Sequence, residues 1–233
     1  MRSRADQDMT HITLINPNTS QATTAMMTEI VRKYLPSGFT TEGVTAAKGV
    51  PMILNDRELT AAANGVVEMG LAAADRSSGL IVSAFGDPGL EQLKAMSGLP
   101  AVGICEASML EASAGGRRFG IATVTPDLVL NFAAKTEDLG VGHLFTGTRL
   151  TSGDPIELAS DAQRLHTALE GAVRKCFEQD GAEAVIIGGG PLGQAADDLQ
   201  RVLSAPVIAP IRSAVELLLA QIAQSPPVGA RNS

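Results

Sequence analysis

The sequence predicts an α/β protein made of two similar lobes that face each other across a cleft. Short β-branched runs alternate along the chain with amphipathic stretches of helix length, which is typical of mainly parallel sheets covered by helices. At residues 80–90 and again at 184–194, such a run stops at small residues and meets a proline that suits the first turn of a helix. Two such turns at matching places in two halves frame a site for a small molecule.

In the first half, a serine and a threonine are available to cap the first helix, and a run that is apolar throughout indicates a buried strand at 79–83. Strands are expected at 11–16, 39–45, 79–83 and 101–104, and helices at 19–35, 58–76, 88–96 and 106–114.

The same alternation restarts in the second half, where the helix expected at 159–179 is long and amphipathic. Strands are expected at 119–124, 143–149, 184–187 and 206–208, and helices at 126–139, 159–179, 192–203 and 211–224.

An internal repeat supports the two lobes. Residues 99–110 correspond to 205–216, and each of these segments follows the helix after a small-residue turn. Residues 15–19 correspond to 123–127, and each of these segments lies at the start of its half. We expect two pseudo-symmetric Rossmann-like lobes with the active site in the cleft between them. The first lobe would hold 11–104 with 207–224, the second 105–206, and 1–10 and 225–233 would be flexible termini.

Composition excludes several classes of function. The formal net charge is −7 and no run of lysine and arginine suggests a nucleic-acid or membrane surface. Cys105 and Cys176 form neither a disulfide framework nor a metal-ligand spacing, and His11, His143 and His166 are isolated, so surface or satisfied positions are their default. There is no dinucleotide-binding glycine fingerprint. With no apolar run near the roughly 20 residues of a spanning helix, we expect a soluble cytoplasmic protein without metal or nucleotide.

Three motifs resemble those of hydantoin and allantoin racemases, which belong to the aspartate/glutamate racemase superfamily. They are Ile-Asn-Pro-Asn-Thr-Ser at 15–20, Phe-Gly-Asp-Pro-Gly-Leu at 85–90 and Val-Gly-Ile-Cys-Glu-Ala at 102–107, and the likeness covers residues 11–222. The resemblance implies a small-molecule substrate, no cofactor, no metal and a homo-oligomer.

The resemblance also implies a mechanism with two opposed thiols, one removing the α-proton as a thiolate and the other protonating the opposite face. The first thiol would precede the phenylalanine of the Phe-Gly-Asp turn, where this chain has Ala84. The second would follow the glycine that ends the later strand, where this chain has Gly189. We therefore expect no two-thiol racemisation at these positions, and we interpret Cys105 and Cys176 as packing residues.

Two carboxylates are candidates for catalysis. Asp87 precedes the helix-opening Pro88, so it either caps the helix or faces the cleft as a general base. Glu106 opens another helix, where a carboxylate is favourable against the helix dipole, and it is interpreted as a cap first and a catalyst second.

The strand ends supply the candidate binding residues. The loop at 16–20 joins a strand to a helix N-terminus that suits a carboxylate, imide or ureido oxygen, with a capped helix as the alternative. The glycines at 188–190 offer N–H groups for an anion nest, with a tight turn at positive φ as the alternative. The candidates are Asn16, Asn18, Thr19, Ser20, Ser83, Ala84, Phe85, Gly86, Thr123, Thr125, Gly188, Gly189, Gly190 and Pro191.

Three functions remain open on the sequence. The first is an enzyme of this superfamily that acts on a small hydantoin, ureido or carboxylate substrate by one-sided proton transfer, hydrolysis or decarboxylation. The second is a catalytically silent relative that binds such a ligand. The third is an engineered cysteine knock-out of a true hydantoin racemase, against which the Gly-Gly-Gly-Pro run at 188–191 argues, because it departs from the family pattern at several adjacent positions.

Overall fold

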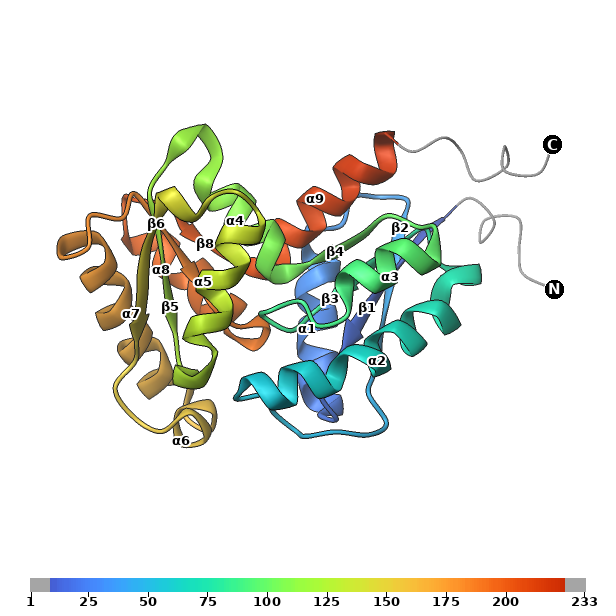
Figure 1. Ribbon diagram of the computed structural model, residues 1–233, viewed down its shortest axis with the longest axis horizontal. Coiled ribbons are helices and arrows are strands. Elements are labelled where there is room, and N and C mark those ends of the chain that lie inside the picture. The colour runs from blue at the N-terminus through green and yellow to red at the C-terminus, as the bar shows by residue number, and fades with distance from the viewer. Residues whose placement is uncertain (1–8, 225–233) are drawn as a thin grey trace.

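The first lobe is a parallel sheet between two layers of helices. The computed structural model describes residues 9–224, and the strand order of this sheet is β2-β1-β3-β4 (Figure 1). Helices α1 and α9 cover one face, and α2 and α3 cover the other. The strands are β1 (Thr10–Asn16), β2 (Phe39–Thr45), β3 (Gly79–Val82) and β4 (Ala101–Gly103), and the helices are α1 (Gln21–Tyr34), α2 (Asp56–Ala73), α3 (Leu90–Ser97) and α9 (Pro210–Gln224).

The second lobe repeats this arrangement with the order β6-β5-β7-β8, again parallel throughout. Helices α7 and α8 pack on one face and α4 and α5 on the other, while the short α6 precedes α7. The strands are β5 (Phe119–Thr123), β6 (Phe145–Leu150), β7 (Ala184–Ile187) and β8 (Val207–Ile208), and the helices are α4 (Ile104–Ser113), α5 (Val129–Asp138), α6 (Pro155–Ala159), α7 (Ala162–Glu178) and α8 (Gly193–Val202).

The predicted α/β class and every predicted strand are confirmed, and two helices differ from expectation. The helix expected from residue 88 begins at Leu90, because Asp87 at φ 50° and Gly89 at φ 72° hold left-handed backbone conformations that a helix cannot include. The helix expected at 159–179 begins later, as α7 at Ala162, and a separate short helix that was not expected, α6, precedes it. Asp161 caps the start of α7 by accepting the N–H of Arg164 at 3.0 Å.

Two boundaries also differ. Helix α9 packs on α1, β3 and β4 of the first lobe and also on α4 of the second. Strand β8, however, pairs with β7 in the second sheet, although residues 207–224 were all expected in the first lobe. Thr10 already belongs to β1 rather than to a terminal segment. The remainder of the predicted flexible termini, 1–8 and 225–233, lies outside the described residues.

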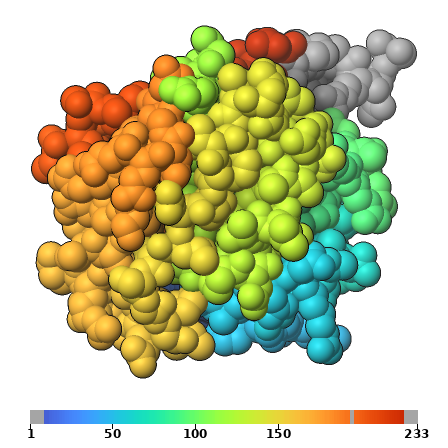
Figure 2. Space-filling model, turned by 60° about the vertical axis from the view of Figure 1, so that its left-hand side comes forward, coloured from blue at the N-terminus to red at the C-terminus, as the bar shows by residue number. Residues whose placement is uncertain are grey.

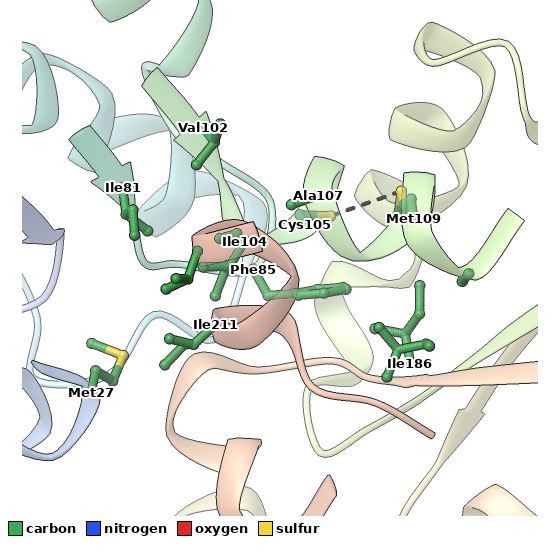
Figure 3. Close-up of a cluster of buried hydrophobic side chains, with 14 of the residues drawn as sticks. Met27, Ile81, Phe85, Val102, Ile104, Cys105, Ala107, Met109, Ile186 and Ile211 are labelled. Carbon is green, nitrogen blue, oxygen red and sulfur yellow. Dashed lines mark hydrogen bonds between the residues drawn. The ribbon is translucent and has the colours of Figure 1, made fainter. Parts of the chain in front are cut away.

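One buried cluster joins the two lobes. Ile81 and Phe85 of the first lobe belong to the same cluster as Ile186 of β7 in the second lobe (Figure 3). The ring of Phe85 also stands edge-on to Phe132 of α5, with 5.0 Å between their centroids. The lobes are therefore packed against each other, and their contact fixes the relative position of the strand ends. Among residues 9–224, no helix is long and apolar enough to cross a membrane.

Candidate functional site

A cavity of about 530 Å³ lies where the carboxyl ends of the two sheets face each other. Its walls include residues from the turns after β1, β3, β5 and β7, as expected for a ligand site in an α/β protein. Figure 2 looks onto the second lobe, and the cyan start of α2 from the first lobe adjoins it at the lower edge. Nine predicted site residues line the cavity, namely Asn18, Ser83, Ala84, Phe85, Thr125, Gly188, Gly189, Gly190 and Pro191.

In the first lobe, Asn16 positions Asn18. Asn16 is fully buried at the end of β1, and its Nδ2 donates to Oδ1 of Asn18 at 2.9 Å and to Oγ1 of Thr24 at 2.9 Å. The backbone N–H of Ser20 donates to the same Oδ1 at 2.9 Å. Because Oδ1 of Asn18 accepts both hydrogen bonds, its Nδ2 is the end of the amide left for a ligand.

The rest of this loop has structural tasks. Ser20 caps α1, its Oγ accepting the N–H of Thr23 at 3.2 Å. The N–H of Thr19 donates to the carbonyl of Val50 at 3.0 Å. Neither Thr19 nor Ser20 lines the cavity, whereas Thr23, which the sequence did not indicate, does.

The second lobe has a matching pair at the end of β5. Thr123 is fully buried, and its hydroxyl donates to the carbonyl of Gly188 at 2.7 Å and lies 3.1 Å from the hydroxyl of Thr125. Thr125 lines the cavity and Thr123 does not. In each lobe, therefore, a buried polar residue at the strand end supports the cavity residue two positions later.

The glycines at 188–190 serve close packing. None of the three has positive φ, so the turn here does not need glycine for a left-handed backbone. A Cβ on Gly190 would lie 2.7 Å from Sδ of Met27 and 2.9 Å from the carbonyl oxygen of Ser83. This is a close approach of the turns that end β3 and β7, one from each lobe.

The same turn offers fewer N–H groups than an anion nest requires. The N–H of Gly188 donates to the carbonyl of Ala122 at 2.8 Å, and that of Gly189 donates to the carbonyl of Ile187 at 2.9 Å. Pro191 has no N–H. The three atoms nearest a Cβ on Gly189 belong to the side chain of Leu192, the closest at 3.0 Å, so this position accepts a small side chain if Leu192 shifts.

The turn after β3 contributes Ser83, Ala84 and Phe85 to the cavity. Strand β3 ends at Val82, so Ser83 and Ala84 do not alternate across the sheet and both line the wall. The Ser83 hydroxyl donates to the carbonyl of Ile15 at 2.9 Å. Gly86 lies behind the wall at φ 129°, where a Cβ would come within 2.7 Å of Leu59.

Asp87 caps α4 and does not line the cavity. Its carboxylate oxygens accept the N–H groups of Cys105 and Glu106 at 2.8 and 2.7 Å, and its side chain is completely buried. Lys135 of the second lobe places Nζ 3.7 Å away. Burial raises the pKa of Asp87 to about 7, although Lys135 and the two N–H groups oppose this change. The carboxylate therefore caps α4 rather than α3, the helix it precedes in the sequence.

Glu106 is held as a cap and an ion-pair partner, also away from the cavity. One oxygen lies 3.5 Å from the backbone nitrogen of Gly103, the residue that precedes α4, and the other accepts from Lys94 at 2.8 Å. Each oxygen of the Glu106 carboxylate has a partner, which explains how this charged group can be buried.

The two cysteines are fully buried and do not line the cavity. The Cys105 thiol packs 4.0 Å from Sδ of Met109 (Figure 3), and burial raises its pKa well above the usual value. Burial likewise raises the pKa of the Cys176 thiol to about 12. Both thiols therefore stay protonated near neutral pH.

The structure adds wall residues that the sequence did not indicate. Most are apolar, but His166 on α7 and Asp198 on α8 also line the cavity. Additional apolar wall residues include Met26, Met52, Ile53, Leu59, Leu128, Leu165 and Leu192. Among residues 9–224, no group of three or more histidine, cysteine or acidic side chains could hold a metal.

A family model described as Asp/Glu/hydantoin racemase matches residues 12–218. The chain belongs to the Asp/Glu/hydantoin racemase family. It is 24% identical to a hydantoin racemase from Paenarthrobacter aurescens over 206 residues, which cover 87% of each chain. It is 25% identical to a hydantoin racemase from Rhizobium meliloti, over 89% of this chain and 86% of the relative.

Solved structures agree with this family. An allantoin racemase from Klebsiella pneumoniae superposes with a TM-score of 0.88 at 27% identity, over 92% of this chain and 88% of the other. Unliganded arylmalonate decarboxylase superposes with a TM-score of 0.65 at 18% identity, over 94% of each chain, and shares the fold. This racemase-family fold accounts for the two parallel sheets and for a cavity at their facing ends.

Proposed function

We propose that this racemase-family protein is an enzyme that binds a small hydantoin, ureido compound or carboxylate between its lobes and acts on it without a pair of opposed thiols. The observation that carries the proposal is the cavity wall itself. Ala84 and Gly189, the positions that the family resemblance equates with the thiols, both line it, and the two cysteines lie buried elsewhere.

The polar groups of the cavity suit a ligand with carbonyl or carboxylate oxygens. Nδ2 of Asn18 is a donor whose orientation is set by its neighbours. Thr23 and Thr125 lie on the walls of opposite lobes. A planar imide or ureido group presents oxygens and N–H groups at its edge, and these groups could pair with it from both sides.

The apolar part of the wall suits an apolar substituent on that ligand. Met26 and Met52 carry flexible thioethers that adapt to different shapes, and Phe85 and Leu128 add rigid and branched surface. We expect a 5-alkyl or 5-aryl hydantoin to bind more tightly than allantoin, whose ureido substituent would lose hydrogen bonds to water against this wall.

In this proposal Asp87 and Glu106 are caps rather than proton-transfer groups. Inversion of a stereocentre needs an acid and a base on opposite faces of the carbon. Without the thiol pair, proton transfer from one side, ring hydrolysis and decarboxylation are the reactions that remain. The same replacements support a second function, a silent relative that binds the ligand without turnover.

Proton NMR in D₂O tests the proposal with purified protein and 5-substituted hydantoins, allantoin, N-carbamoyl amino acids, aspartate, glutamate and arylmalonates. Loss of an α-proton signal, ring opening or decarboxylation above the protein-free rate would support an enzyme. Line broadening of a ligand without any reaction would favour the silent relative. Neither broadening nor reaction across the panel would contradict both functions.

A further inference from the structure

His166 lies on the cavity wall, on the side that belongs to the second lobe. It shares the wall with Ala162 and Leu165 of the same helix, α7. The spacing of three and four residues places all three on one face of that helix. His166 is partly buried, so the protein shields it in part, and it borders the cavity.

Elimination among the described residues leaves His166 as the wall residue whose side chain can both accept and donate a proton. The thiols of Cys105 and Cys176 and the carboxylates of Asp87 and Glu106 do not line the cavity. Asp198 does, but its Oδ1 accepts a hydrogen bond from Arg201 at 3.0 Å. Imidazole accepts a proton when neutral and donates one when charged, which is why histidine so often serves as an acid and base.

We infer that His166 is the proton-transfer residue of this cavity, a role that rests on the proposed function. The neutral ring takes the proton from the carbon next to a ligand carbonyl. The C–H bond breaks, an N–H bond forms on the ring, and the electron pair moves onto the carbonyl oxygen as an enolate. In D₂O the imidazolium exchanges its proton for a deuteron, and return of that deuteron to the carbon restores the neutral ring.

The first lobe supplies the complementary donor. Nδ2 of Asn18 can hydrogen-bond the enolate oxygen as its charge develops, and the contacts with Asn16 and Ser20 keep that amide oriented. Because the base stands on the second-lobe side alone, the deuteron returns to the face from which the proton left. The expected outcome is exchange with retained configuration.

The test uses (S)-5-benzylhydantoin in D₂O with the full chain and the variant His166→Gln. We expect the variant to lose about 100-fold of the exchange rate, the lower range for a general base, while its affinity for the same hydantoin changes only a few-fold. His143→Gln is the matched control, because His143 is exposed in a short helix and does not line the cavity. Its exchange rate should equal that of the parent.

A second variant separates chemistry from structure. His166→Ala opens space beside the cavity, and added free imidazole should restore part of its exchange rate, which a structural role for His166 would not allow. Unchanged exchange in His166→Gln, or binding without exchange in the parent, would overturn the role of His166 and leave the ligand site standing. Absence of binding by the parent would overturn the proposed function and this inference together.

Discussion

Asn16 donates its side-chain N–H to Oδ1 of Asn18 at 2.9 Å, so a buried residue at the end of β1 orients an amide on the cavity wall. In this sequence motif, Asn16 therefore supports Asn18, and Asn18, two positions later, lines the cavity. Thr123 and Thr125 repeat this relationship at the end of β5 in the second lobe.

Replacing Asn16 tests this support. Asn16→Ala removes the donor to Asn18 and to Thr24, so we expect ligand affinity to fall about tenfold or more, equivalent to about 1.4 kcal/mol. We also expect a stability loss of about 1–3 kcal/mol. Calorimetric titration and urea unfolding measure the two effects.

The matched control for Asn16→Ala is Thr13→Val. Thr13 is buried on the same strand, and its hydroxyl lies 2.7 Å from that of Ser77, away from the cavity. We expect Thr13→Val to be less stable than the parent and to bind the ligand with the same affinity. Equal affinity of Asn16→Ala and the parent would remove the supporting role of Asn16.

The glycine turn provides a second prediction. Gly190→Ala places a methyl group against Met27 and the Ser83 carbonyl, and we expect it to lower the free energy of unfolding by about 1–3 kcal/mol. The atoms nearest a methyl group at position 189 belong to the side chain of Leu192, which can move, so the unfolding midpoint of Gly189→Ala should stay close to that of the parent. Equal effects of the two substitutions would contradict the packing role assigned to Gly190.

Asp87 gives a pH-dependent prediction. Burial raises its pKa from 3.8 to about 7, so the folded state binds this proton more tightly than the unfolded state. Between these two values the free energy of unfolding therefore falls as the pH rises, by about 1.4 kcal/mol for each increase of one in pH. In Asp87→Asn that contribution is absent, and asparagine tolerates the positive φ of 50°.

Urea unfolding at a series of pH values between 4 and 8 checks this expectation. The stability advantage of the parent over Asp87→Asn should shrink as the pH rises. Asp138→Asn removes an exposed carboxylate and serves as the control for the loss of one charge. A constant difference between parent and Asp87→Asn at every pH would show that Asp87 does not titrate in this range.

Restoring thiols tests what the family resemblance implies. The double variant Ala84→Cys with Gly189→Cys places two thiols on the cavity wall, and the space beside Gly189 accepts a side chain if Leu192 shifts. We expect racemisation of a 5-substituted hydantoin to appear, measured by chiral chromatography. Each single variant is the control, and continued absence of racemisation in the double variant would mean that the cavity holds its ligand in another position.

Much of the fold could be predicted because local signals agree with it. The β-branched run at 79–83 ends in small residues, and the structure has β3 there followed by a turn. The start of α3 could not be predicted, because the left-handed backbone of Asp87 follows from its capping of α4, a contact between residues 18 and 19 positions apart.

The site was predicted at the strand ends and missed on the helices. Asn18, Thr125 and the turn residues follow strands, and parallel strands bring their ends together. His166 sits in an amphipathic helix, where sequence alone does not tell which partly buried face meets the other lobe. The roles of Gly188 to Gly190 also depend on lobe contact, since the carbonyl nearest Gly190 comes from Ser83.

The most direct measurement follows one enantiomer of 5-benzylhydantoin in D₂O with the unmodified chain, recording α-proton exchange by NMR and configuration by chiral chromatography in the same sample, against a protein-free blank. The account predicts exchange well above the blank while the configuration is retained, as expected for a cavity with a base on one side. Exchange and inversion rising together above the blank would show an acid and a base on opposite faces and would contradict it.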